Sequence, residues 1–276
     1  MPTNWDTVID AFLPEDGFSG TLVGRVWRPD VKGPSVVAIR GSGVIDITAS
    51  VPAMSILTNA DDPSAIAGTD GENIGDWRAI AANSVAATRD PSLPCFLSPT
   101  DLHAHKACGV TFVRSLLERV IDERTAGDPA LAEEVRAELL ESIGIDLSEI
   151  VPGSIEAETV KAALLERDMW SQYLEVGIGP YAEVFSKAQP MSAVGFGAEI
   201  GIHPMSTWNN PEPEVVLIGS TAGRIVGAAL GNDVNLRDVE GRSALLLGRA
   251  KDNNGSCAVG PLIRLLDGTF TLDDVR

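Results

Sequence analysis

Short apolar runs interrupted by glycine and proline fill the first hundred residues of this 276-residue chain, and they return after about residue 171. Such runs of β-branched and apolar residues between turn signals are typical of β-strands. Two of them, GTLVGRVWRP and PSVVAIRGSGVIDIT, follow each other directly, and the GSG at residues 41–43 predicts a hairpin turn. Strands this short, with frequent glycine, favour a mixed β (α+β) fold over a doubly wound parallel sheet.

The stretch between residues 110 and 170 has a different character, because it is rich in charges and shows the amphipathic pattern of helices. One helix is predicted with Asp128 as N-cap, Pro129 at the first helical position and Gly144 as the stop signal. A second helix is predicted after Ser154, and a shorter one over FVRSLLERVIDE. After this stretch, runs such as QYLEVGIG and EVVLIGS predict strands again.

Composition narrows the possible partners and compartments. A hydrophobic content of 44% suits a globular core, and a net charge of −18 repels nucleic acid and anionic membranes. The three cysteines show neither a disulfide framework nor zinc-ligand spacing, which indicates a reducing compartment. No run approaches the length of a membrane span, and the N-terminus lacks the apolar core of a signal peptide. We therefore expect a cytoplasmic protein without nucleic-acid or membrane partners.

Two glutamates stand at the head of one apolar run, NNPEPEVVLIG. Because side chains alternate along a strand, Glu212 and Glu214 share one face, where like charges repel unless a cation or water separates them. Residues 209–211 are turn formers, so the pair taken alone is more simply a solvated strand end. A metal site is the second interpretation.

Further charged residues favour the interpretation as a metal site. Asp233 lies just past a later apolar strand, and Lys251 follows the run SALLLG, which also predicts a strand. Three carboxylates near strand ends can supply oxygen ligands to a hard divalent ion such as Mg²⁺. A nearby lysine can polarise a carbonyl group or move a proton if burial lowers its pKa. Spacing alone leaves open whether these residues meet in space.

Three segments in order, EPEVVLIG, GNDVNLRD and AKDNNGSCAVGP, resemble the motifs of the fumarylacetoacetate hydrolase superfamily. The segments GVTF at 109–112 and EVFSK at 183–187 match two more family landmarks, and the likeness covers residues 105 to about 265. Within the family, WSQYLEVGIGP, KAQPMSAVG and STWNNPEPEVVL are most similar to bacterial enzymes that dehydrate 2-keto-3-deoxy sugar acids. The resemblance implies a β-roll fold with a helical insertion.

The resemblance also implies roles for individual residues. It implies a site for Mg²⁺, or for Mn²⁺ or Ca²⁺, whose ligands are Glu212, Glu214 and Asp233. Lys251 would be the catalytic lysine, Lys187 would lie near the substrate carboxylate, and Arg237 would bind or order the site. Thr207 is a further candidate for a hydrogen bond to a substrate oxygen.

Two positions depart from the family pattern. Family hydrolases carry a histidine and a glutamate three residues apart that activate water, and here Ser115 and Glu118 stand in those places. A serine is no base near neutral pH without an activating partner, which favours a lyase over a hydrolase. Glu240 stands where many members have glutamine, so an oxyanion contact there is in doubt.

The favoured hypothesis is a metal-dependent dehydratase that converts a 2-keto-3-deoxy pentonate into 2-ketoglutarate semialdehyde, with Lys251 or Glu118 removing the C3 proton. One alternative is a hydrolase that cleaves a C–C bond of a diketo acid, with Ser115 and Glu118 beside the metal. Another alternative is a metal-binding fragment without catalysis. Family membership would also imply a homodimer or a larger homo-oligomer.

The domain layout follows from the same resemblance. We expect a β-rich N-terminal domain at 1–100 and a catalytic β-roll domain at 101–276, with the helical insertion at about 113–170. Family members continue past the GP segment with more strands, so the C-terminal part of the roll is expected to be missing and the chain to be part of a longer protein.

Overall fold

The computed structural model describes residues 3–109, 121, 124–125, 129–143, 150–166, 168, 170 and 172–275. The chain forms two compact units. The first consists of Met1–His105, Ser186–Glu240 and Gly248–Arg276, and the second of Lys106–Phe185 and Gly241–Leu247. This grouping differs from the predicted division into 1–100 and 101–276, which stays a prediction.

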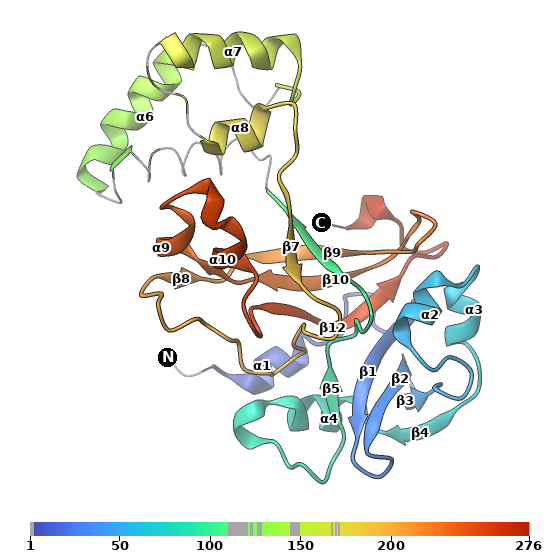
Figure 1. Ribbon diagram of the computed structural model, residues 1–276. Helices are drawn as coiled ribbons and strands as arrows, with labels where there is room; N and C mark the ends of the chain where they lie inside the picture. The colour runs from blue at the N-terminus through green and yellow to red at the C-terminus, as the bar shows by residue number, and fades with distance from the viewer. Residues whose placement is uncertain are drawn as a thin grey trace. The chain divides into compact units, whose positions relative to one another are not determined.

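An antiparallel sheet of eight strands forms the first unit, in the order β4-β3-β2-β1-β12-β10-β9 with β5 paired to β1 (Figure 1). Its strands are β1 (Leu22–Arg28), β2 (Gly33–Arg40), β3 (Gly43–Asp46), β4 (Glu72–Gly75), β5 (Cys95–Leu97), β9 (Pro213–Gly219), β10 (Ile225–Asp233) and β12 (Cys257–Leu265). Leu22 of β1 lies opposite Arg264 of β12, so strands from both ends of the chain meet in the middle of one sheet.

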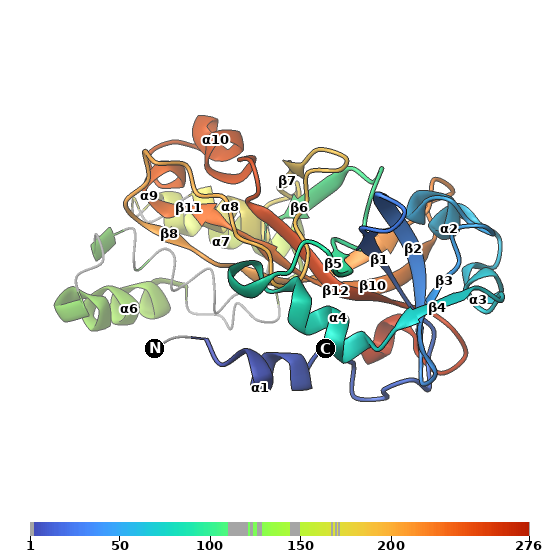
Figure 2. The ribbon, with the colours of Figure 1, turned by 90° about the horizontal axis from the view of Figure 1, so that it is seen from below.

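Helices cover both faces of this sheet. Alternate residues of β2 enter different hydrophobic clusters, Val36 and Ala38 one and Val37 and Ile39 the other, because side chains alternate across a strand. The first cluster includes residues of α2 (Met54–Asn59) and α3 (Pro63–Ala67). The second includes residues of α1 (Trp5–Asp10) and α4 (Trp77–Ser84), which lie near each other in Figure 2. Strand β1 is therefore buried at nearly every position, which explains its lack of polar alternation.

Several shorter elements occur elsewhere along the described chain. Two small sheets pair β8 (Asn209–Asn210) with β11 (Asn235–Leu236) and β6 (His105–Cys108) with β7 (Val184–Ala188). The remaining short helices are α9 (Arg237–Glu240), α10 (Leu247–Lys251) and the 3₁₀ turns at Ala86–Thr88, Ala244–Leu246 and Leu272–Asp274. Asn209 and Asn210, predicted as turn residues, thus form a short strand.

The second unit contains the helices α6 (Pro129–Ile143), α7 (Ile155–Glu166) and α8 (Gln172–Ile178). Residues 129–143 are helical as the sequence predicts, while the predicted N-cap Asp128 and stop Gly144 lie outside the described residues. Ser154 caps α7 by accepting a hydrogen bond from the Ala157 N–H at 3.1 Å. The predicted helix over FVRSLLERVIDE lies almost entirely outside the described residues. Among the described helices, none has both the length and the apolar character that crossing a membrane requires.

The structure confirms one predicted turn and corrects two predicted strands. The hairpin at 41–43 joins β2 to β3, and Gly43 has a φ of 130°, which side chains other than glycine rarely tolerate. QYLEVGIG forms the helix α8, because Leu174 and Ile178, four residues apart, enter one hydrophobic cluster. SALLLG forms a 3₁₀ turn and the start of α10, and its Leu245 is 94% exposed, unlike a residue of a buried strand.

Candidate metal centre and active site

The adjoining ends of two strands bring three carboxylates together. β9 and β10 pair antiparallel, so the start of β9 lies opposite the end of β10. Glu212 immediately precedes β9, Glu214 is its second residue, and Asp233 is the last residue of β10. One oxygen of each carboxylate lies within 4.8 Å of the other two. The structure therefore brings together the three residues that the sequence singles out as metal ligands.

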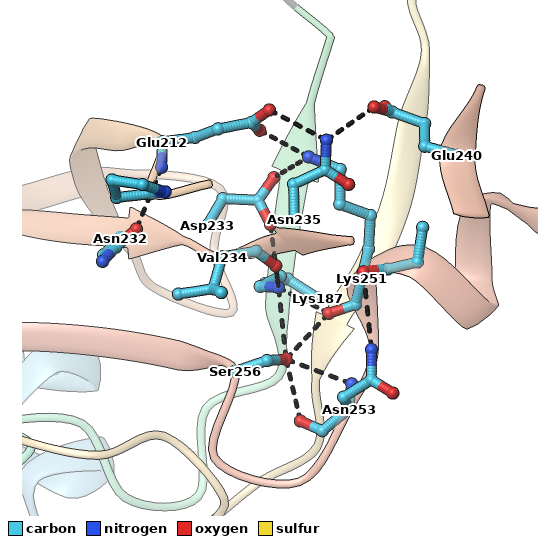
Figure 3. A network of polar contacts seen from close by, with 12 residues as sticks. Lys187, Glu212, Asn232, Asp233, Val234, Asn235, Glu240, Lys251, Asn253 and Ser256 are labelled. Carbon is cyan, nitrogen blue, oxygen red and sulfur yellow. Dashed lines mark hydrogen bonds and ion pairs between the residues drawn. The ribbon is translucent and has the colours of Figure 1, made fainter. Parts of the chain in front are cut away.

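Lys251 lies against this cluster from the end of α10. Its side chain is only 4% exposed, and its ammonium group donates to Glu212 Oε2 and, at 3.0 Å, to Asp233 Oδ2 (Figure 3). Lys251 is the last residue of the short helix α10, whereas the sequence predicted that it follows a strand. The predicted catalytic lysine thus shares two partners with the predicted metal.

Lys187, near the end of β7, lies on the other side of Asp233. Its ammonium is 2.9 Å from Asp233 Oδ1, an ion pair that is not aligned as a hydrogen bond. It donates to the backbone oxygens of Val234, at 2.8 Å, and of Lys251, and it lies 3.3 Å from Ser256 Oγ (Figure 3). Lys187 is 2% exposed, so these protein oxygens surround its charge.

The charges of the cluster shift two pKa values. Burial raises the pKa of Glu214, and the neighbouring charges of Asp233 and Glu212 raise it further, against the opposing effect of the two lysines. Burial lowers the pKa of Lys251, but the attraction of Asp233, Glu212 and Glu240 outweighs burial and leaves it above its ordinary value. Without a cation, therefore, the cluster disfavours the charge of one glutamate and holds the lysine protonated.

A carboxamide that the sequence analysis did not single out completes the cluster. Asn235, which is fully buried in β11, donates through Nδ2 to Glu212 Oε1 at 3.2 Å and to Glu240 Oε2 at 2.6 Å. The available signal was its spacing of two from Asp233, because alternate residues of an extended chain share a face. Figure 3 shows the amide between the two glutamates.

The other predicted site residues lie further out or outside the described residues. Arg237 forms an ion pair with Glu240 at 3.5 Å, and Glu240 in turn accepts a hydrogen bond from Asn235. Thr207 donates from its N–H and its hydroxyl to Asp238 Oδ2, at 3.0 and 3.3 Å, which ties its loop to α9. Ser115 and Glu118 lie outside the described residues.

The carboxylate cluster fits a hard divalent cation. Three carboxylates face the two ammonium groups of Lys187 and Lys251, which leaves a net negative charge in a largely buried place. Mg²⁺ prefers oxygen ligands and binds through few protein carboxylates, keeping its other positions for water or substrate. A cation there would also relieve the repulsion that disfavours the charge of Glu214.

Comparison with solved structures establishes the class of fold. The chain matches the apo form of 2-keto-3-deoxy-D-arabinonate dehydratase with a TM-score of 0.57 at 19% identity, over 89% of this chain and 66% of that one. A second solved structure, "2-keto-3-deoxy-D-arabinonate dehydratase complexed with magnesium and 2,5-dioxopentanoate", matches with a TM-score of 0.50 at 20% identity, over 88% and 65%. The mixed α/β fold with a large antiparallel sheet, shared with these solved structures, is therefore as predicted.

Comparison with curated sequences agrees with this fold. The chain is 30% identical to a Haloferax volcanii protein named "Probable 2-keto-3-deoxyxylonate dehydratase". The 154 aligned residues cover 55% of this chain and 53% of that protein. It is 40% identical over 81 residues to the 2-dehydro-3-deoxy-D-arabinonate dehydratase of Saccharolobus solfataricus, over 29% and 27%. The first match thus spans about half of its relative and the second about a quarter. No model of a protein family matches the chain.

Proposed function

We propose that this chain carries the active site of a metal-dependent dehydratase that removes water from a 2-keto-3-deoxy pentonate and yields 2-ketoglutarate semialdehyde. The observation that carries the proposal is the buried cluster of three carboxylates with Lys251 bonded to two of them. Two curated relatives named as dehydratases of such acids support the substrate class. The similar structure described as a complex with magnesium and 2,5-dioxopentanoate, the same semialdehyde, supports the metal and the product.

The proposed metal is Mg²⁺, with Mn²⁺ or Ca²⁺ as alternatives, held by Glu212, Glu214 and Asp233. When bound, such an ion polarises the C2 carbonyl of a 2-keto acid, which acidifies the C3 protons and stabilises the enolate. The two lysines balance most of the charge of the three carboxylates, so the site is still negative before a metal ion binds. Once a divalent ion binds, the site attracts an anionic substrate.

Lys251 is the proposed base in the described part of the site. Its pKa stands above the ordinary value because Asp233 and Glu212 attract its charge. Lys251 loses part of that attraction once the same carboxylates bind a cation, and its burial then favours the neutral amine that a base requires. Glu118 remains the alternative base, and it lies outside the described residues.

The proposed reaction balances without an oxidant or a second substrate. The base removes a proton from C3, and the C4 hydroxyl leaves with a proton as water, which forms a C3–C4 double bond. Transfer of a proton from C5 to C3 then moves the double bond to C4–C5, and the resulting enol becomes the C5 aldehyde. The carbon skeleton stays intact, which distinguishes this reaction from the hydrolysis of a diketo acid.

The contacts of Lys187 favour a role in positioning Asp233 over a contact with the substrate. Its ammonium already contacts two backbone oxygens and Asp233, so we propose that it holds that carboxylate in place. We propose that Arg237 orders the site, a role that its ion pair with Glu240 supports. Thr207 bonds Asp238 in this structure, and its contact with substrate stays a prediction, as does assembly into a homodimer or larger oligomer.

Product analysis with the natural protein and Mg²⁺ tests the proposal. With a 2-keto-3-deoxy pentonate as substrate, we expect the loss of one water and a new aldehyde, both abolished by a chelator. Lys251→Ala should reduce turnover by about 10²–10⁴-fold, the usual worth of a general acid or base. Two carbon fragments from an acylpyruvate, without dehydration of the sugar acid, would instead establish the hydrolase. Metal binding without either reaction would leave the non-catalytic alternative.

A further inference from the structure

Asn235 occupies an unusual position for a neutral side chain, because its amide lies between two carboxylates. Nδ2 is 3.2 Å from Glu212 Oε1 and 2.6 Å from Glu240 Oε2 (Figure 3). An amide NH₂ has two hydrogens, so it can donate one to each carboxylate at the same time. The residue is fully buried, so water does not compete for these bonds.

Chemistry determines which end of this amide faces the carboxylates. Ionised carboxylates only accept hydrogen bonds, so the NH₂ end must lie toward Glu212 and Glu240. The opposite end, Asn235 Oδ1, is buried and receives no hydrogen bond from the described residues. A buried acceptor without a donor costs free energy, so the residue is not explained by its contribution to folding alone.

The two oxygens of Glu212 have different partners, and this difference matters for metal binding. Oε1 accepts from Asn235 at 3.2 Å and, over a longer 3.5 Å, from Asn210 Nδ2, while Oε2 accepts from Lys251. The hydrogen bond from Asn235, the shorter of the two to Oε1, helps to hold the direction of the side chain with Oε2 on the side of Lys251 and Asp233. A cation that binds there competes with Lys251 for Oε2 and leaves the bond from Asn235 in place.

Glu240 in turn holds the amide. It accepts the shorter of the two hydrogen bonds from Asn235 and forms an ion pair with Arg237 at 3.5 Å. With Glu240 present, the NH₂ end of the amide cannot turn away from Glu212 without losing that bond. Glu240 therefore supports the orientation that Glu212 needs.

We propose that Asn235 is a positioning residue of the metal centre, which presents Glu212 to the cation through Nδ2 and is itself oriented by Glu240. This inference rests on the proposed metal site and extends it to a residue beyond the three ligands. Hydrogen-bonded partners of metal ligands commonly govern metal affinity, and their loss typically costs 10–100-fold.

The test measures Mg²⁺ affinity by calorimetry and Mn²⁺ affinity by electron paramagnetic resonance, on the natural protein and on variants. Asn235→Ala should weaken binding of both ions by about 10–100-fold. Asn235→Ser retains one donor, which can bond only one carboxylate. Its metal affinity should lie between those of the natural protein and of Asn235→Ala. Glu240→Ala should weaken binding in the natural protein and have no further effect in the Asn235→Ala background, since the two residues act in series.

Asn83→Ala is the matched control. The Asn83 amide, in α4, donates to the backbone oxygens of Asp90, Leu93 and Pro94, and so it serves the fold rather than a metal ligand. This variant should lower the melting temperature without changing metal affinity more than about twofold. A structural role for Asn235 would give the same pattern as this control.

Each outcome decides the matter. Unchanged affinity in Asn235→Ala overturns the inference and leaves the metal site standing. Absence of binding in the natural protein overturns both the inference and the proposed metal site. Loss of affinity in Asn83→Ala as well would show that binding follows general stability, which also overturns it. If Asn235→Ala does not fold, Asn235→Ser is judged by the same criteria, and failure of both to fold assigns the residue to the fold.

Discussion

At the scale of the residue, the negative charge of Glu214 destabilises the folded protein when no metal ion is bound. Its pKa is raised by burial and by Asp233 and Glu212, so its ionised form is disfavoured in the folded state. A raised pKa means that the stabilising contribution is present at low pH and is lost as the pH rises through that pKa. Glu214→Gln should therefore stabilise the metal-free protein near neutral pH, by about 0.5–1 kcal/mol, the size of like-charge effects between neighbouring strands.

Thermal unfolding at several pH values, in the presence of a chelator, checks this prediction. The difference in melting temperature between Glu214→Gln and the natural protein should grow as the pH rises from acid to neutral. Glu199→Gln, at an exposed position, supplies the control for the loss of one negative charge. Equal stability changes in the two variants would attribute the effect to net charge rather than to the cluster.

The three cysteines differ in their surroundings, which predicts their reactivity. Burial raises the pKa of the Cys257 thiol to about 11 and also raises the pKa of Cys95, so neither forms a thiolate readily near neutral pH. Cys108 is exposed. A maleimide at neutral pH should therefore label one thiol in the folded protein and three in denaturant, as counted by mass spectrometry. Cys108→Ser should abolish the labelling of the folded protein, and rapid labelling of Cys257 would contradict the burial of β12.

At the scale of the element, helix α2 depends on a carboxylate from a distant segment. Asp101 accepts the Met54 N–H at 2.6 Å and the Ser55 N–H at 2.9 Å, so it caps the first turn. Burial would raise the pKa of Asp101, but hydrogen bonds from His103 and from backbone N–H groups hold it well below the ordinary value. Its contribution to stability is thus present above the ordinary aspartate pKa and is lost as the pH falls toward the lowered one.

Asp101→Ala should destabilise the fold by about 1–2 kcal/mol, the usual cost of losing a strong helix cap, with the larger value expected from its burial. Denaturant unfolding at neutral pH measures this loss. Asp76→Ala removes the exposed cap of α4 and serves as the comparison, since it deletes one hydrogen bond, to the Ala79 N–H. A smaller effect from Asp101→Ala than from Asp76→Ala would contradict this account of α2.

Elements were predictable from the sequence where a local signal sets their ends. The described residues of α6, from Pro129 onward, are helical as predicted, and Glu214 lies at the start of β9 as expected. Asp233, predicted just past its strand, is the last residue of β10. Short apolar runs were not predictable in the same way, because a run of that length fits a strand or a helix equally well. The runs in α8 and α10 became helices for this reason, and Lys251 reached the cluster from a helix end instead of a strand end.

At the scale of the whole molecule, the fold joins distant parts of the chain around the site. Asp233 lies at the end of β10, which pairs with β12, and β12 pairs with β1 from the start of the chain. Local sequence patterns do not show such long-range pairing, so the support of the site by N-terminal strands was invisible to them. Asn235 was missed for a similar reason, since its function depends on Glu212 and Glu240, which it meets only in the folded chain.

The net charge of −18 and the buried cluster predict two separable responses of the whole molecule to salts. Sodium chloride screens general repulsion and should raise the melting temperature of the natural protein and of Glu214→Gln alike. Mg²⁺ at matched ionic strength should stabilise the natural protein further, by about 2.7 kcal/mol at a hundredfold excess over its Kd, and Glu214→Gln much less. This extra stabilisation should decline as the pH falls, beginning above the ordinary glutamate range, because protons compete with the ion at Glu214, whose pKa is raised. Equal responses to the two salts in both proteins would mean that the carboxylates bind no ion and that screening accounts for the whole effect.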